Sequence, residues 1–200
     1  MKQRFAALRY FAGALALNLS FGLVAFAQQA AGGQQGAAPP PVKEYPKTRL
    51  EGMALEWARA RDYTKEYLDA MPEAGLSFKP TPEIRSFAEQ MLHLANANFS
   101  FGARLTGQTN PYAGKNLEKL DEFKTKAALT KVVVESYDFM INGIKKLDDA
   151  KLDTRVPVVG MNRPLTALFA AAFEHQTHHR GQTTIYLRLK GVTPPGEKLY

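Results

Sequence analysis

The stretch Glu174-His-Gln-Thr-His-His-Arg-Gly-Gln182 places two of the chain's four histidines, His175 and His179, four residues apart. An α-helix advances about 100° and about 1.5 Å per residue, so both imidazoles project from one face and can reach one cation. The pair belongs to a helical pattern with 4-3-4-3-4-3 spacing, formed by Leu168, Ala172, His175, His179, Gln182, Tyr186 and Leu189. Because buried imidazole nitrogens need hydrogen bonds or a metal, histidines on this inward stripe indicate a binding site.

Three further helices are expected before this one. Thr48-Arg-Leu-Glu51 has the pattern of a capping box and opens a helix that ends near Pro72. Thr81-Pro-Glu83 supplies a cap, a first-turn proline and an early acid for a helix that runs to about Leu105. The third helix is predicted by apolar residues at helical intervals, which are Leu129, Val133, Tyr137, Met140, Ile144 and Leu147.

The fourth helix, which carries the histidine pair, is expected from Pro164 to Lys190. Long connections precede the third and fourth helices, from Gly107 to Asp121 and from Asp148 to Arg163. The second connection contains a short β-like stretch, Val156–Val159, for which we expect no partner strand. Four amphipathic helices without a strand pair predict an all-α fold, a four-helix bundle with long loop connections.

The N-terminal 47 residues differ in composition from the rest. Three cations precede an uncharged apolar stretch from Tyr10 to Phe26, which ends in the small-x-small pattern that signal peptidase cuts. We interpret residues 1–27 as a removed secretory signal, with a retained membrane anchor as the alternative. Residues 28–47, rich in Gln, Ala, Gly and Pro, predict a flexible low-complexity linker before the folded domain at 48–200. We therefore expect a periplasmic or secreted protein without stable membrane insertion.

Composition excludes several classes of function. The chain has no cysteine, so disulfides, a thiol nucleophile and thiolate metal ligands are excluded. Of its 26 lysines and arginines three lie in the expected signal, which leaves 23 against 19 acids and a net charge of +4. These cations are spread among acids, so no nucleic-acid partner is expected. A homodimer through a bundle face is compatible with the sequence, although no specific residue points to one.

His93, on the second expected helix, is the candidate third ligand for the histidine pair. It shares its face with small and polar residues, which are Ser86, Gln90, Ala97 and Ser100. A polar face usually points at water, so His93 taken alone fits a surface histidine. The alternative is that its small and polar neighbours line a wet cavity inside the bundle. For His175 and His179 we favour metal ligation over hydrogen-bonded core histidines.

Residues near the pair are candidates for supporting roles. His178 is expected at the rim of the site, although it could instead be the partner of His175 or a fourth ligand. Gln182 and Tyr186 are the candidate catalytic residues, because each could hydrogen-bond a metal-bound water or a substrate; the alternative is packing with a polar tip at the bundle end. An enzyme would need a cavity beside the metal, lined by these two residues and Asn96.

Two more residues of the motif are expected to be structural. Arg180 should point away from the inward stripe and pair with Glu174 or Asp138. Gly181 should allow a close approach between helices.

Two other metal-site templates do not fit. Position 176 is Gln where a zinc-protease helix carries its general-base Glu, and the Glu-x-x-His pair of di-iron bundles is missing from the sequence.

Four motifs resemble the DinB-like metalloprotein family, a bundle family named after damage-inducible proteins and related to bacillithiol and mycothiol S-transferases. They are Ser86-Phe-Ala-Glu-Gln-Met-Leu-His-Leu-Ala95, Ser136-Tyr-Asp138, His175-Gln-Thr-His-His-Arg-Gly-Gln182 and Tyr186-Leu-Arg-Leu-Lys-Gly-Val-Thr-Pro-Pro195. The resemblance covers about residues 48 to 196.

The resemblance implies a four-helix bundle in which His93, His175 and His179 hold one divalent metal with water in the remaining positions. Zinc or nickel is expected, since imidazole suits both. The function would be a metal-dependent hydrolase or thiol S-transferase acting on a small-molecule substrate. The alternatives are a non-catalytic module that binds metal or a small ligand, and a scaffold without metal. The expected export signal departs from the thiol transferases, which look cytosolic, and weakens the expectation of a bacillithiol or mycothiol substrate.

Overall fold

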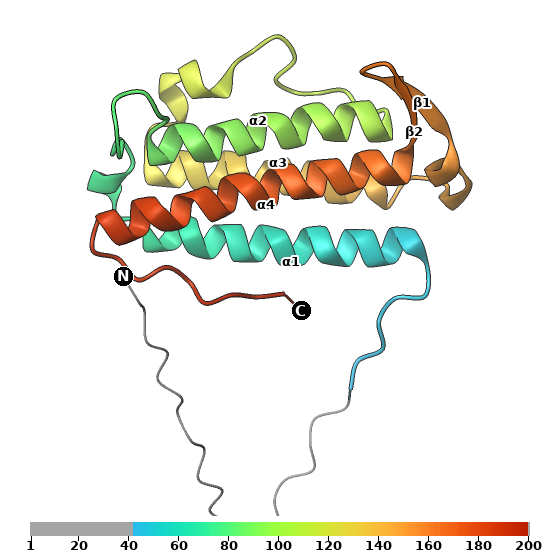
Figure 1. Cartoon of the computed structure of the whole chain (residues 1–200), viewed down its shortest axis with the longest axis horizontal. Helices are drawn as coiled ribbons and strands as arrows, with labels where there is room; N and C mark the ends of the chain where they lie inside the picture. The colour runs from blue at the N-terminus through green and yellow to red at the C-terminus, as the bar shows by residue number, and fades with distance from the viewer. Residues whose placement is uncertain (1–41, 200) are drawn as a thin grey trace, which may run out of the picture. The chain divides into compact units, whose positions relative to one another are not determined.

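Four long helices run side by side in a bundle (Figure 1). The computed structural model describes residues 42–199, so the expected signal and most of the expected linker lie outside the described residues. The helices are α1 (Arg49–Ala70), α2 (Phe87–Thr106), α3 (Lys126–Ile144) and α4 (Leu165–Leu189). The predicted four-helix bundle is confirmed. Among the described helices, none has the length and apolar content needed to span a membrane.

The loops between the helices contain short elements, including one strand pair that the sequence analysis did not expect. They are the 3₁₀ helices η1 (Glu73–Gly75), η2 (Leu117–Lys119), η3 (Asp121–Phe123) and η4 (Asp149–Asp153), and the strands β1 (Arg155–Val158) and β2 (Met161–Pro164). The strands pair antiparallel, with Val158 opposite Met161. Their turn holds Val159 at φ 46° and Gly160 at φ 72°. A β-branched residue at positive φ is uncommon, so this hairpin lacks the usual sequence signal.

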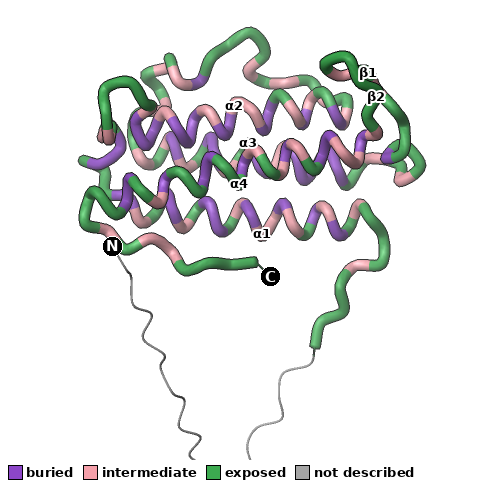
Figure 2. The backbone as a smooth tube through the Cα atoms, in the orientation of Figure 1, coloured by how far each residue is buried: buried purple, intermediate pink, exposed green. Residues whose placement is uncertain are grey.

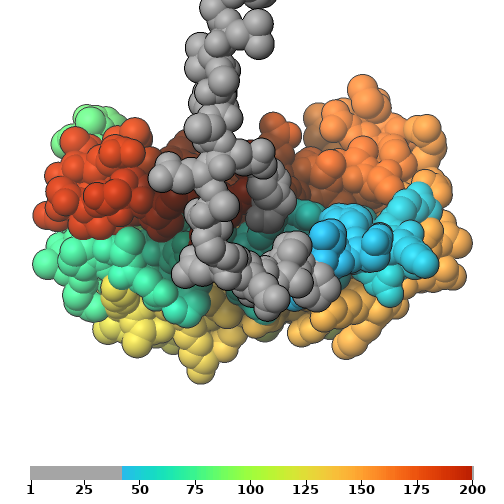
Figure 3. Space-filling view, turned by 90° about the horizontal axis from the view of Figure 1, so that it is seen from below, coloured from blue at the N-terminus to red at the C-terminus, as the bar shows by residue number. Residues whose placement is uncertain are grey.

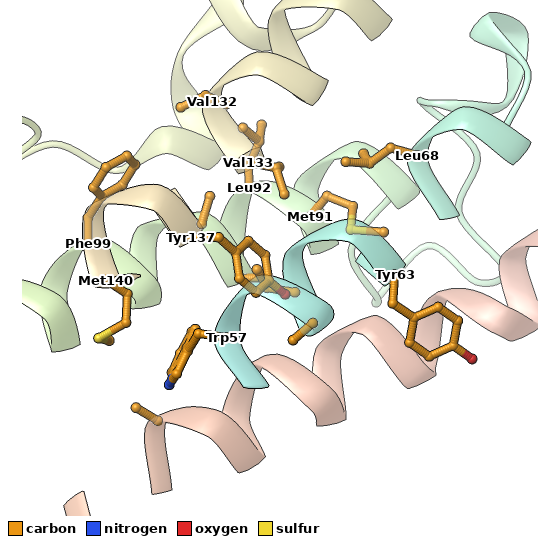
Figure 4. Close-up of a cluster of buried hydrophobic side chains, with 14 of the residues drawn as sticks. Trp57, Tyr63, Leu68, Met91, Leu92, Phe99, Val132, Val133, Tyr137 and Met140 are labelled. Atoms are coloured by element: carbon orange, nitrogen blue, oxygen red, sulfur yellow. The ribbon is translucent and has the colours of Figure 1, made fainter. Parts of the chain in front are cut away.

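The core lies between the helices and is dominated by large apolar side chains (Figure 2). Trp57 of α1 packs against Tyr137 of α3, with ring centroids 5.8 Å apart, and both rings are buried (Figure 4). The expected start of α1 is confirmed, since the Thr48 hydroxyl accepts a hydrogen bond from the Glu51 amide at 3.2 Å. Burial of these faces holds α1 and α3 together.

The start of α2 differs from the expectation. The sequence analysis placed the cap at Thr81, but the helix begins at Phe87 with Ser86 as its N-cap. The Ser86 hydroxyl accepts from the Glu89 amide and the Glu89 carboxylate accepts from the Ser86 amide, a reciprocal capping box. This box satisfies two backbone amides at once. It is therefore a stronger helix start than the sequence signal at Thr81, and the helix begins after Ser86. The residues around Thr81 form a turn instead, closed by the Ile84 amide and the Thr81 carbonyl.

The buried face of α4 is also rotated from the expected stripe. Gln182 and Leu189 are exposed, whereas Gln176, Arg180 and Thr183 are buried. A strict 4-3 spacing has a period of 3.5 residues, and an α-helix drifts away from it by about 20° per heptad. Over the three heptads of the expected stripe, this drift carries Gln182 and Leu189 out of the core, whereas Tyr186 stays buried.

Replacing the cap of α2 should lower stability. We expect Ser86→Ala to reduce the free energy of unfolding by about 1 kcal/mol, because the Glu89 amide loses its acceptor. Thr81→Ala, at the cap expected from sequence, should change the free energy by less than about 0.5 kcal/mol. Urea unfolding followed by circular dichroism measures both. An equal loss from the two variants would contradict the position of the helix start.

Candidate metal centre

Three histidines from two helices meet in the bundle. His93 lies on α2, whereas His175 and His179 lie on successive turns of α4. One ring nitrogen from each lies within 4.8 Å of the other two. The ring centroids of His93 and His179 are 4.5 Å apart, and those of His175 and His179 are 4.4 Å apart. The structure thus brings together the three residues that the sequence analysis proposed as ligands.

His93 is oriented by a carboxylate from a loop. Its Nδ1 lies 2.9 Å from Oε1 of Glu118, a residue of η2, and its side chain is 28% exposed. Glu118 also accepts a hydrogen bond from Nε of Arg85 at 2.8 Å. A carboxylate beside Nδ1 favours the tautomer with its proton there and leaves the lone pair of Nε2 for a cation. His93 is therefore held by a hydrogen-bond partner from another part of the chain. The interpretation of His93 as a surface histidine is not supported.

His179 is held by an amide from α2. Its Nδ1 lies 3.0 Å from the side-chain amide of Gln90, and both residues are buried. As placed, the amide nitrogen of Gln90 faces the ring, so Nδ1 accepts from it and the proton lies on Nε2 of His179. Binding of a cation through Nε2 requires the Gln90 amide to turn over, so that its oxygen accepts from Nδ1–H as Glu118 does at His93.

His175 has a buried nitrogen without a partner. Its Nδ1 makes no hydrogen bond within the described residues, and the ring packs against Phe101 at a centroid distance of 5.8 Å. An unpaired imidazole nitrogen out of water costs free energy. An ion bound at Nδ1 itself, or a small movement of the ring that brings Nδ1 to a hydrogen-bond partner, would remove this cost.

The electrostatics keep two of the rings neutral. Burial, together with the neighbouring His175 and His93, lowers the pKa of His179 to about 4. Burial and His93 also lower the pKa of His175. Burial raises the pKa of Glu118, but hydrogen bonds from Arg85 and His93 outweigh this and lower the net value. At neutral pH His175 and His179 are therefore neutral, and neutral imidazole is the form that binds metal.

The donor set fits a divalent metal of the zinc type. Ligand nitrogens at about 2.0–2.1 Å from a tetrahedral ion lie about 3.4 Å apart. The three nitrogens here lie within 4.8 Å, so modest rotation of the side chains would suffice to close the site.

His178 lies outside this cluster. It is exposed, and its ring meets His179 edge-on at a centroid distance of 5.0 Å. Its Nε2 lies 2.8 Å from the amide nitrogen of Gln182. Among the described residues, the group of nitrogens close enough for one ion contains His93, His175 and His179 only.

A cavity of about 710 Å³ lies beside the residues that contact His93 and His179, although none of the three clustered histidines lines it. Its walls include Glu118 and Gln90, the two residues that contact His93 and His179, together with Arg85. The candidate catalytic residues Gln182 and Tyr186 also line it. The Tyr186 hydroxyl donates to the carbonyl of Arg85 at 2.7 Å, whereas the Gln182 amide contacts His178. Asn96, the third expected lining residue, is not among those that line this cavity.

Sequence analysis missed Glu118, Gln90 and Arg85 as parts of the site. Gln90 had a detectable signal, since it precedes His93 by three residues on the same helical face. Glu118 lies in the long connection between α2 and α3, where no periodicity indicates which side chains face inward. Its contact with His93 spans 25 residues and exists only in the folded chain.

Arg180 and Gly181 are placed differently from the expectations. Arg180 is buried and donates to the side-chain oxygen of Gln176 at 3.0 Å, while Asp138 pairs with Arg61. A Cβ atom at Gly181 would meet nothing within 4 Å, so this glycine does not serve a close helix approach. Both differences follow from the rotation of α4 relative to the expected stripe.

Comparisons with known proteins agree with this architecture. The sequence profile of the DinB superfamily matches residues 56–183. Protein YrdA of Bacillus subtilis strain 168 is 40% identical over 48 residues, which span 24% of this chain and 29% of that protein. The aligned stretch thus covers less than a third of the relative.

Solved structures share the fold. A DinB-like protein from Bacillus cereus superposes with a TM-score of 0.63 at 21% identity, covering 74% of this chain and 97% of that one. The DinB-like protein YjoA from B. subtilis gives 0.57 at 21% identity, covering 74% and 96%. A conserved protein from Enterococcus faecalis gives 0.61 at 15% identity, covering 72% and 98%. Together with the profile match over most of the folded domain, the four-helix architecture leads to one conclusion: the chain belongs to the DinB superfamily.

Proposed function

We propose that this protein binds one divalent metal, zinc or nickel, through His93, His175 and His179. The observation that carries the proposal is the convergence of one nitrogen from each ring to within 4.8 Å. Glu118 supports it, because a carboxylate on the far nitrogen of a ring is the arrangement that orients metal-binding histidines. Imidazole ligands suit both metals.

We further propose that the metal site acts on a small-molecule substrate, as a hydrolase or a thiol S-transferase. A divalent ion with an open position supplies polarisation of a substrate oxygen, or activation of a water or a thiol. In the adjoining cavity, Arg85 is held in place by Glu118 and can orient a polar substrate group. The exposed position of His178 favours an open site over the alternative, a closed non-catalytic site with four histidine ligands.

We retain export to the periplasm or the medium as a proposal, supported by the signal-like segment at residues 1–27. Sequencing the N-terminus of the protein recovered from the periplasm of an expression host tests this. A mature N-terminus near Gln28 supports the proposal, whereas an intact protein in the cytosol contradicts it.

Removing any of the three proposed ligands should remove the metal. We expect elemental analysis of the purified protein to find one equivalent of metal, and His93→Ala, His175→Ala and His179→Ala each to lose most of it. His178→Ala is the matched control on the same helix and should keep its metal, because it lies outside the cluster. Full occupancy in His93→Ala would contradict the three-histidine site.

Glu118 should strengthen metal binding without contacting the metal. We expect Glu118→Gln to weaken metal affinity about 10-fold to 100-fold, because the neutral amide supports His93 less well. Competition with a chelator of known affinity measures this loss. Glu83→Gln is the control, since Glu83 lines the same cavity but makes no contact with the histidines. Equal affinities in the two variants would show that the Glu118 contact has no role in binding.

The metal-free protein should lose stability in mild acid. The pKa of His179 lies at about 4 in the folded chain against 6.5 without the fold, so the unfolded chain takes up the proton more readily. This contribution to stability is present above pH 6.5 and is lost as the pH falls toward 4. Urea unfolding in the presence of a chelator measures the slope. His179→Gln should flatten it, and an unchanged slope in this variant would contradict the assignment.

A further inference from the structure

A second polar feature lies on the side of α4 away from the histidine cluster. Arg180 is only 6% exposed, and its guanidinium carbon lies 4.5 Å above the centre of the Tyr63 ring. One of its nitrogens donates to Gln176. Across residues 42–199, no carboxylate forms an ion pair with Arg180. A buried cation without a counter-charge is costly, and apart from Gln176 and the nearby Tyr137 hydroxyl the described residues offer the Arg180 guanidinium no hydrogen-bond acceptor.

Arg180 faces a cavity of about 280 Å³ between α1, α4 and the C-terminal segment. This segment turns back from the end of α4 and runs beside α1 (Figures 1 and 3). Arg59 of α1 donates to the Lys198 carbonyl, and the Lys198 side chain pairs with Glu66. These contacts close one side of the cavity. None of the three clustered histidines lines it.

The other walls of the cavity provide neutral hydrogen-bond donors. Tyr63 and Tyr67 line it, with their hydroxyls 3.4 Å apart, and the Tyr67 hydroxyl lies 3.2 Å from that of Thr184. Figure 4 shows Tyr63 reaching beyond the apolar core cluster. Burial raises the pKa of Tyr63 to about 12, so at neutral pH its hydroxyl keeps the proton that it can donate.

The charges around the cavity leave one cation uncompensated. Arg59 pairs with Glu56 at 2.7 Å, and Lys198 pairs with Glu66. Glu197 is the one acid among the lining residues, and it makes no ion pair with Arg180 in the described part of the chain. Among residues 42–199, the positive charge of Arg180 therefore has no ion-pair partner.

We propose that this cavity is a second, metal-independent site, which binds a small oxyanion on the guanidinium of Arg180. A planar guanidinium matches the geometry of a carboxylate or a phosphate and binds either through two parallel hydrogen bonds. The volume of about 280 Å³ restricts the ligand to small anions rather than larger cofactors. Gly181 contributes the space, because it lines the cavity and has no side chain to fill it.

Titration with inorganic phosphate and, separately, with acetate tests the proposal. Calorimetry and the thermal midpoint of unfolding are followed at constant ionic strength set by chloride. We expect saturable binding of at least one of the two anions to the wild-type protein, which also identifies the preferred chemistry. Glu197→Gln should bind more tightly, because it removes a like charge from the wall.

Two variants should weaken binding. Arg180→Met should lower affinity at least about tenfold, as expected for the loss of a bidentate charge-assisted contact. Gly181→Leu should fold normally, because a Cβ atom there meets nothing within 4 Å, but its side chain enters the cavity. Gly196→Leu is the matched control, since Gly196 also has free space around it but does not line the cavity.

His175→Ala separates this site from the metal centre and should retain anion binding. Three results would overturn the proposal: no saturable binding of either anion, unchanged binding in Arg180→Met or Gly181→Leu, or binding that is lost in His175→Ala. The last result would place the anion at the histidine cluster instead.

Discussion

Polar side chains on the buried face of α4 impose the main constraint on this bundle. His179, Gln176 and Arg180 are all buried in the bundle. Each needs a partner, because an unpaired polar group out of water costs free energy. The partners come from the three other helices: Gln90 of α2 for His179, Tyr137 of α3 for Gln176, and Tyr63 of α1 for Arg180. Each contact fixes how one of these helices is rotated about its own axis relative to α4. Apolar packing supplies the bulk of the stability, and these contacts select the arrangement.

Two polar groups on α4 remain incompletely satisfied, and both lie at proposed ligand sites. Within the described part of the chain, the Nδ1 atom of His175 has no hydrogen-bond partner, and the charge of Arg180 has no ion-pair partner. A folded chain tolerates such groups where a ligand completes them. The sites lie on different sides of α4, so a single helix would hold a metal on one face and an anion on another.

The likeness to solved structures establishes the architecture and leaves the chemistry to the site. At 15% to 21% identity, these structures share the arrangement of helices with this chain. In the site, His93, Glu118 and Arg85 form one connected group. Glu118 lies between a ring of the proposed metal centre and a cation in the wall of the adjoining cavity. This loop residue therefore couples the geometry of the centre to that of the space where a substrate would lie.

The sequence by itself determined the four helices and the pairing of His175 with His179, because helical periodicity and capping are local properties of the chain. It left His93 ambiguous, since one helix cannot reveal whether a polar face meets water or a cavity. Tertiary structure decided that question when the loop carrying Glu118 folded over the ring. It also decided the rotation of α4, which buried Arg180 and exposed Gln182. The rotation of α4 depends on the packing of all four helices. That packing is made of contacts between residues far apart in the chain, and such contacts leave no periodic signal in the sequence.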